Sequence, residues 1–169
     1  MANSKPRIWE LDALRGVCIL CVIVVHFLFD LSFFGGLDLT LPAWYVFIQE
    51  YGGAIFVVLS GVCVTLGSKS VRRGLIVFAC GMLITAVTYG MYRLGMSGMD
   101  VVVKFGVLHL LGVCMLVYPA FKKLPPAMLT VLGVAIAITG YAIRGIIVPQ
   151  HWLFPLGLTY EGFTSSDYF

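Results

Sequence analysis

Charged side chains are scarce in this sequence. They make up 11% of the 169 residues, whereas a soluble domain carries about 25%. Hydrophobic residues make up 60%, and the mean hydropathy is +1.01. The few charges cluster between long apolar runs, and nothing outside those runs is long enough to bury a core of its own. This scarcity excludes an ordinary soluble domain and favours an integral membrane protein.

Signals for nucleic-acid binding and for metal binding are also missing. The net charge is +3, but no basic patch with interleaved aromatic residues is present, so we expect no nucleic acid partner. The five cysteines all lie in apolar runs, and no second Cys or His pair follows Cys18-x-x-Cys21. We therefore interpret them as small apolar side chains and expect no metal site.

Five apolar segments approach the ~20 residues that a helix needs to cross the hydrocarbon core of a bilayer. They predict an all-α, polytopic membrane bundle of about five transmembrane helices, forming a single domain over residues 1–169. The first segment is too long for a signal peptide and lacks a small-x-small cleavage site, so we interpret it as a permanent helix. The expected helices cover residues 13–34, 46–67, 73–92, 105–121 and 126–148.

The basic residues predict a cytoplasmic N-terminus. In that orientation most of them lie on the inner side, as the positive-inside rule requires. The inner residues are Lys5, Arg7, Arg15, Lys69, Arg72, Arg73, Lys122 and Lys123, and the outer ones are Arg93, Lys104 and Arg144. The aromatic-rich segment from Pro149 onward then lies outside, at the membrane interface. We expect that the natural chain continues beyond Phe169.

The first expected helix carries four ionisable residues, which are costly inside a membrane and usually functional. At 100° per residue, Arg15 and His26 lie within about 20° of each other, and Asp12 and Asp30 each lie about 60° further round. The four therefore share one stripe, which we expect to face the bundle interior. Asp30 can orient the imidazole of His26 and raise its basicity, and Asp12 can pair with Arg15.

Two residues outside the first helix are further candidates. His109 begins the fourth expected helix, at a depth that could approach that of His26. Ser60 and the following Gly61 offer a small polar surface where another helix or a slim ligand could approach closely. Helix packing alone also accounts for Ser60, and an interfacial position alone accounts for His109.

A short basic loop is the last candidate. Lys69, Arg72 and Arg73 lie on the predicted inner side, where three cations would suit a phosphate-rich cytoplasmic ligand. Membrane topology alone also explains these charges, and a snorkelling interfacial pair would equally explain Asp12 and Arg15.

Several motifs give the chain a family resemblance. Arg15 and His26, separated by ten residues, resemble the pattern of the acyltransferase-three family, which modifies surface polysaccharides with a cytoplasmic acyl donor. Over nearly its whole length, the chain is most similar to the bacterial relatives of heparan-alpha-glucosaminide N-acetyltransferase. Three segments carry that similarity: residues 11–16, 105–109 and 165–169.

The resemblance implies transfer of an acetyl group from cytoplasmic acetyl-CoA, across the bacterial cytoplasmic membrane, to an amine or hydroxyl of an extracytoplasmic glycan. We predict that His26, oriented by Asp30, acts as general base or briefly carries the acetyl group, and that His109 assists. The residues that we expect to bind acetyl-CoA are Asp12, Arg15, Ser60, Arg72 and Arg73.

Two other functional classes stay open. A small transporter or non-catalytic membrane subunit would use the stripe as a proton or ion path, although no repeat or pair of broken helices is evident. A b-type haem protein would use His26 and His109 as axial ligands, although the usual second His pair is missing. The acceptor, the choice between N- and O-acetylation, and homo-oligomer formation are not determined by the sequence.

Overall fold

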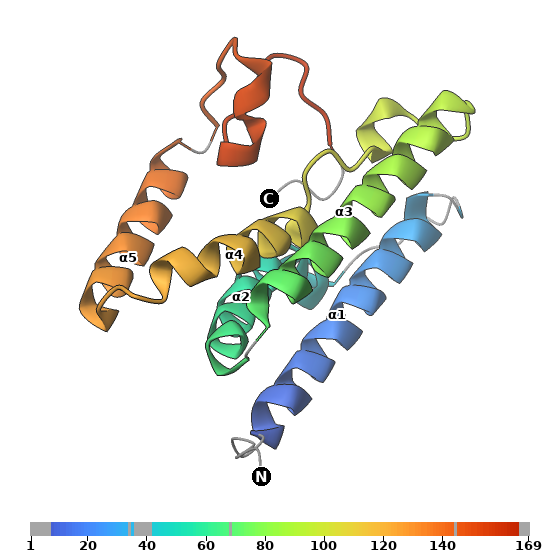
Figure 1. Cartoon of the computed structure of the whole chain (residues 1–169). Coiled ribbons are helices and arrows are strands. Elements are labelled where there is room, and N and C mark those ends of the chain that lie inside the picture. Colours follow the sequence, from blue (N-terminus) through green and yellow to red (C-terminus); the bar gives the residue numbers. More distant parts are fainter. Residues whose placement is uncertain (1–7, 34, 36–41, 68, 144, 166–169) are drawn as a thin grey trace. The chain divides into compact units, whose positions relative to one another are not determined.

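The computed structural model describes residues 8–33, 35, 42–67, 69–143 and 145–165. Within these residues, all five predicted helices are present, and the all-helical membrane fold is confirmed (Figure 1). The helices are α1 (Trp9–Phe33), α2 (Ala43–Leu66), α3 (Ser70–Arg93), α4 (Val107–Phe121) and α5 (Pro126–Ile143). Two short 3-10 helices, η1 (Met99–Val101) and η2 (His151–Leu156), precede α4 and follow α5.

The observed helix ends differ from the predicted ones by a few residues, for local reasons. α1 begins at Trp9 because the acidic side chains of Glu10 and Asp12 stabilise its first turn through the helix dipole. α5 begins at Pro126, as expected for a residue that lacks an N–H. It ends earlier than predicted because Gly145, with φ of +83°, turns the chain out of the helix.

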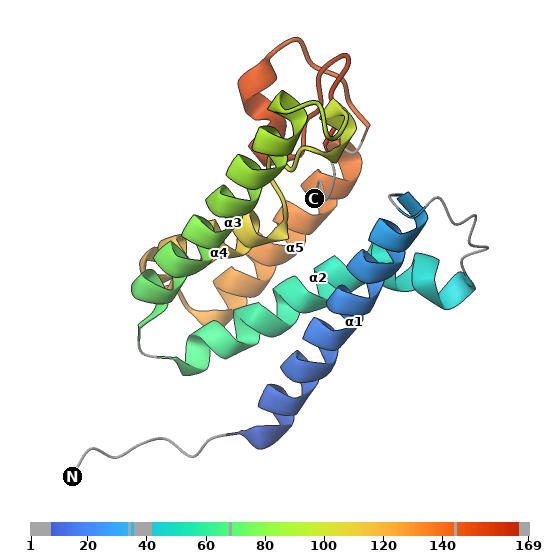
Figure 2. The same cartoon turned by 90° about the vertical axis from the view of Figure 1, so that its right-hand side faces the viewer.

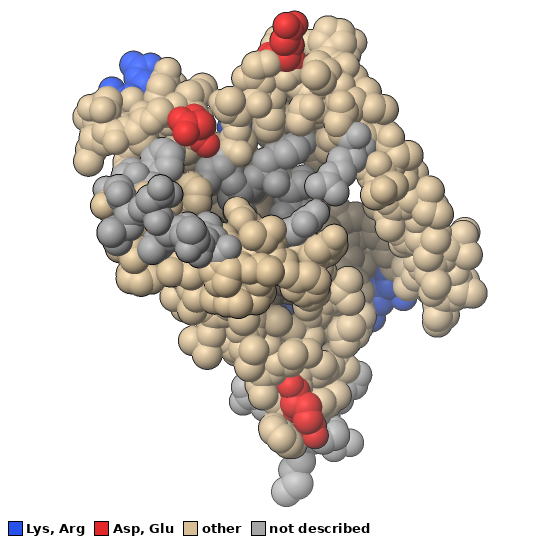
Figure 3. Space-filling view, turned by 180° about the vertical axis from the view of Figure 1, so that it is seen from behind, with Lys and Arg blue, Asp and Glu red and all other residues tan. Residues whose placement is uncertain are grey.

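The helices are those of an integral membrane protein. Among the described residues, α1, α3 and α5 are long and apolar enough to cross a membrane, and α2 is a fourth span if its two halves, bent by 46°, are counted together. α5 contains no buried residue. Nearly all of the described surface in Figure 3 is uncharged, with a few isolated Asp, Glu, Lys and Arg side chains. Such outward-facing apolar surface suits contact with lipid.

The chain divides into two compact units, residues 1–67 and 68–169, each of which is described by itself. In the first unit, α1 and α2 pack on each other (Figure 2). Tyr45 of α2 is 1% exposed, and its hydroxyl donates to the carbonyl of Val25 in α1 over 3.5 Å. This hydrogen bond is at the long end of the accepted range, so the α1–α2 contact is mostly apolar.

In the second unit, α3 and α4 approach closely because glycines remove side chains from their contact. A Cβ added to Gly112 would lie 2.7–2.8 Å from Phe78, including its backbone nitrogen and Cα. A Cβ on Gly81 would lie 3.1 Å from the ring of His109, and one on Gly74 would lie 3.0 Å from the carbonyl oxygen of Gly112. In lipid, close packing of this kind replaces the hydrophobic effect as the force that joins helices.

The fourth predicted helix is the shortest of the five described. α4 has 15 residues and is about 22 Å long, short of the ~30 Å hydrocarbon core. It begins near the middle of α3, because the ring of His109 packs on Gly81. The non-helical segment before it, residues 102–106, runs beside the C-terminal half of α3 (Figure 1). Non-helical backbone at this depth is stable in a membrane only where protein or water satisfies its polar groups.

Candidate functional site

The polar stripe lies on one continuous helix, because α1 is unbroken from Trp9 to Phe33. Asp12 and Arg15 are half-buried, whereas His26 and Asp30 are exposed. Both His26 and Asp30 belong to the described part of the chain, and no hydrogen bond or ion pair joins them there. Within the first unit, the N-terminal half of the stripe is therefore partly covered and its C-terminal half is exposed.

The packing of α1 on α2 explains the exposure of His26. Cys18, Val25 and Phe29 are half-buried on one face of α1, and the Tyr45 hydroxyl reaches the Val25 carbonyl on that face. His26 follows Val25 directly and is therefore turned about 100° away. The imidazole thus lies beside the α1–α2 contact, where it is accessible.

The side chain of Arg15, in the first unit, contains a buried hydrogen-bond donor, Nε, that has no hydrogen-bond partner among the described residues. A buried donor without a partner costs about 1–3 kcal/mol, so an anionic or carbonyl group that reached this atom would be stabilised.

Ser60, the other candidate of the first unit, is buried at 7% exposure in α2. Its neighbour Gly61 makes no close contact, since a Cβ added there would have no atom within 4 Å. The close approach that we expected at these two residues is therefore absent at Gly61.

His109 occupies a fully enclosed position in the second unit, with 3% of its surface exposed. Its Nδ1 accepts a hydrogen bond from the Gly106 N–H over 3.2 Å, and its Nε2 lies 3.2 Å from Oγ1 of Thr85. The ring stacks on Phe105, with 5.5 Å between centroids, and meets the edge of Phe78 at 5.7 Å. Both ring nitrogens thus have partners inside the protein.

Threonine hydroxyls of α3 bind the non-helical segment before α4. The Thr85 hydroxyl donates to the carbonyl of Val103 over 2.7 Å, and the Val103 N–H donates to Oγ1 of Thr88 over 3.2 Å. Val103 itself is 9% exposed. Side chains therefore satisfy backbone groups that a continuous helix would satisfy through its own ladder.

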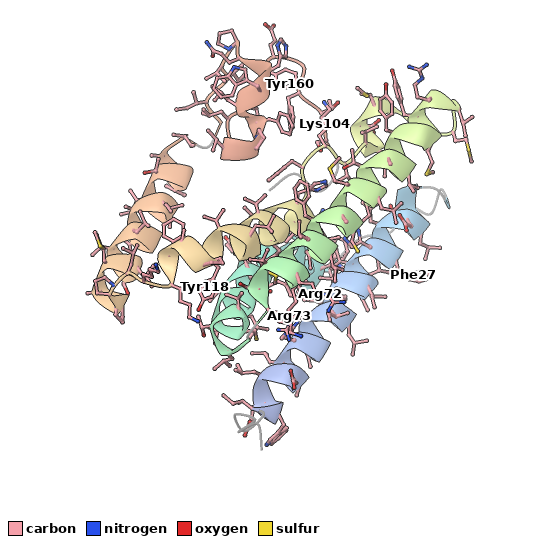
Figure 4. The ribbon with its side chains drawn as sticks, viewed as in Figure 1. Phe27, Arg72, Arg73, Lys104, Tyr118 and Tyr160 are labelled. Atoms are coloured by element: carbon pink, nitrogen blue, oxygen red, sulfur yellow. The ribbon has the colours of Figure 1, made fainter. Side chains whose placement is uncertain are left out.

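The C-terminal segment, residues 145–165, binds the other side of the same stretch. Ser165 accepts a hydrogen bond from the Lys104 N–H over 3.0 Å and donates to the Val102 carbonyl over 3.2 Å. The Lys104 ammonium donates to the Tyr160 hydroxyl over 3.2 Å and lies 4.7 Å from the centre of the Phe163 ring. Figure 4 shows Lys104 and Tyr160 close to each other at this end of the unit.

These hydroxyl contacts were missed by the sequence reasoning. The available signal was Thr85-x-x-Thr88, two hydroxyls one turn apart on an otherwise apolar helix. Ser165 belongs to one of the three segments that carry the family resemblance, but its partners lie 61 and 63 residues away along the chain.

The opposite end of the second unit is basic. Figure 4 shows Arg72 and Arg73 at the N-terminal end of α3, far from Lys104. Within the described part of this unit, α3, α4 and α5 contain no Asp or Glu. The exposed cations at this end are Lys69, Arg72 and Arg73. Their gathering at one end agrees with the predicted inner side, and it would attract phosphate groups.

The structure groups the predicted site residues by unit. Asp12, Arg15, His26 and Asp30 share α1, with Ser60 on α2 of the same unit. Arg72, Arg73 and His109 belong to the second unit, where the two arginines and the histidine lie apart along α3. In the stretches that the structure describes, no three His, Cys, Asp or Glu side chains are placed to hold a metal ion.

Comparison with known proteins gives one match. The family model described as "Heparan-alpha-glucosaminide N-acetyltransferase, catalytic" matches residues 7–169. No curated protein and no solved structure matches the chain. The family match spans both units and includes every predicted site residue.

Proposed function

We propose a specific reaction for this chain, which belongs to the heparan-alpha-glucosaminide N-acetyltransferase catalytic family. Membership of that family indicates a membrane acetyltransferase. The protein transfers the acetyl group of cytoplasmic acetyl-CoA to an amine or hydroxyl of a glycan outside the bacterial cytoplasmic membrane. The family match over residues 7–169 is the observation that carries this proposal.

Two groups of cations support a donor site for acetyl-CoA. The buried Nε of Arg15 lacks a partner, so binding a phosphate or carbonyl oxygen would remove a cost that the free protein bears. Arg72 and Arg73 are exposed in a cluster without acidic neighbours on the same helix. Guanidinium groups bind phosphate in a bidentate manner, so we propose that Arg72 and Arg73 in the second unit bind CoA phosphates. In the first unit we propose that Arg15, Asp12 and Ser60 bind acetyl-CoA.

His26 is the group to which we assign the chemistry. The acceptor nitrogen or oxygen attacks the thioester carbonyl carbon, the carbon–sulfur bond breaks, and CoA leaves as a thiolate that then takes up a proton. His26, exposed on α1, accepts the proton that the attacking group loses. Asp30 lies one turn further along α1, from which its carboxylate can orient the imidazole once an acceptor is bound.

His109 has a different place in this proposal. Its two ring nitrogens are already engaged by Gly106 and Thr85, so a proton transfer at His109 would first have to break one of these contacts. We therefore assign to His109 assistance through position: it holds the start of α4 at the middle of α3.

Transport is a second candidate function, favoured by the 46° bend between the two halves of α2. Transmembrane helices that are interrupted part-way are a recurrent feature of transporters. Solute uptake into vesicles that does not require acetyl-CoA would favour transport over transfer.

The direct test is acetyl-CoA binding to the detergent-solubilised protein. We expect Arg15→Ala to weaken binding about tenfold, which corresponds to ~1.4 kcal/mol. Arg93→Ala, at the opposite end of α3 from Arg72, is the matched control and should bind like the wild type. Wild-type protein that binds no acetyl-CoA, or equal binding by Arg15→Ala, would contradict the proposed donor site.

A further inference from the structure

We infer that Thr85 is a positioning residue for the transferase: it holds His109 as the neutral tautomer with its proton on Nε2, and that tautomer fixes the start of α4 at the middle of α3. The inference deepens the proposed function, on which the role in the reaction rests. The tautomer itself follows from hydrogen-bond geometry within the second unit.

The Thr85 side fixes the proton on Nε2. A threonine hydroxyl has one proton to donate, and that of Thr85 is directed at the Val103 carbonyl, 2.7 Å away. Oγ1 can then meet the His109 Nε2, 3.2 Å away, only as an acceptor. Nε2 must therefore carry a hydrogen.

The Gly106 side leads to the same tautomer by a separate route. A backbone N–H can only donate, and that of Gly106 points at Nδ1 of His109 over 3.2 Å. Nδ1 must therefore be an unprotonated acceptor. Because both sides agree, the imidazole is neutral, with hydrogen on Nε2 alone.

The alternative states are costly for the same reasons. A proton on Nδ1, in the other neutral tautomer or in imidazolium, would face the Gly106 N–H and leave that donor unpaired. In the other neutral tautomer, Nε2 could bind Thr85 only if the hydroxyl released the Val103 carbonyl. Each buried group left unpaired costs about 1–3 kcal/mol.

The position matters because it determines where α4 begins beside α3. Gly106 is buried, and it is the residue before α4. His109 caps its N–H while the His109 ring rests on Gly81 at mid-α3. Thr85 thus links the non-helical stretch, through Val103, to the start of α4, through His109, and holds both against α3.

The first test is ¹⁵N NMR of histidine-labelled protein in lipid nanodiscs. We expect the His109 signals, identified by their loss in His109→Gln, to show an unprotonated Nδ1 and a protonated Nε2. Thr85→Val leaves only the Gly106 N–H to favour this tautomer, so a minor signal from protonated Nδ1 should appear. Thr85→Ser, which keeps the hydroxyl, should restore the wild-type pattern. A protonated Nδ1 in the wild type would overturn the inference, even if Thr85→Val misfolds.

The second test separates position from folding. Thr85→Val should lower kcat for acetyl transfer about tenfold and leave KM for acetyl-CoA unchanged, with rescue by Thr85→Ser. Thr130→Val is the matched control, because the Thr130 hydroxyl bonds only the Pro126 carbonyl of its own helix. Equal kcat for Thr85→Val and wild type would overturn the positioning role. Absence of transfer by the wild type would instead overturn the proposed function, while the nitrogen signals still decide the tautomer.

Discussion

The α1–α2 pair and the α3–α4 pair are held together in different ways. Between α1 and α2, one 3.5 Å hydrogen bond joins Tyr45 to Val25, and a Cβ added to Gly16 would meet no atom within 4 Å. Between α3 and α4, glycines bring the backbones together, and Thr85 and His109 are joined in a buried hydrogen-bonded chain.

The difference separates polar groups that stabilise the helix packing from polar groups that are available to a ligand. His109 has partners on both ring nitrogens, whereas His26 is exposed and the Arg15 Nε is unpartnered. A satisfied polar group stabilises the packing around it, but an unsatisfied one is stabilised further by a ligand. This contrast supports the proposal that α1 carries the chemistry and that α3 and α4 form its scaffold.

The largest loss of stability is expected from Gly112→Ala, which disturbs the close packing of α3 on α4. The added Cβ would lie within 2.8 Å of the Phe78 backbone, which cannot move aside as a flexible side chain can. We expect a loss of about 3 kcal/mol of stability, measured as a fall in the thermal unfolding midpoint in detergent. Gly133→Ala in α5 meets open space and should be neutral or slightly stabilising, since alanine favours a helix over glycine.

A midpoint for Gly112→Ala equal to that of Gly133→Ala would show that α3 and α4 are not in close backbone contact. The comparison of the two pairs would then lose its main support.

A smaller effect is expected from Ser165→Ala. This change leaves the Lys104 N–H and the Val102 carbonyl without their side-chain partner, at a cost of about 2 kcal/mol. Amide hydrogen exchange at Lys104 should become faster while exchange along α5 stays unchanged. Thr164→Ala, which alters the exposed neighbouring hydroxyl, is the control. Unchanged exchange at Lys104 would mean that Ser165 does not hold the non-helical segment before α4.

The smallest effect is expected in the loosely packed pair, from Tyr45→Phe. The hydrogen bond that it removes is long, at 3.5 Å, and its loss should cost about 0.5 kcal/mol. Chemical denaturation of the purified protein would measure this difference. A loss as large as that of Ser165→Ala would make the two pairs equivalent in polar bonding.

Much of the fold could be predicted from the sequence. Apolar runs of near-membrane length predicted all five helices, and the period of 100° correctly placed Asp12, Arg15, His26 and Asp30 on one uninterrupted helix. The start of the fourth helix was predicted at residue 105 and lies at Val107. The sequence did not predict that Thr85, Thr88 and Ser165, which are distant along the chain, bind the non-helical residues before it.

The face of α1 that packs on α2 could not be predicted from the sequence either. Lipid and protein interior are both apolar, so hydrophobicity does not separate the lipid-facing side of a helix from its helix-facing side. Cys18 and Val25 therefore give no signal that distinguishes them from the exposed Ile19 and Ile23. For the same reason, hydrophobicity alone gave no sign that His26 is exposed on α1.

The most direct test of the central claim compares the two histidines in acetyl transfer. CoA release would be measured for the protein in nanodiscs supplied with acetyl-CoA and glucosamine. His26→Ala should lower kcat by about 10²–10⁴-fold without changing the thermal unfolding midpoint, whereas His109→Ala should lower the midpoint. Full transfer by a folded His26→Ala protein would contradict the account.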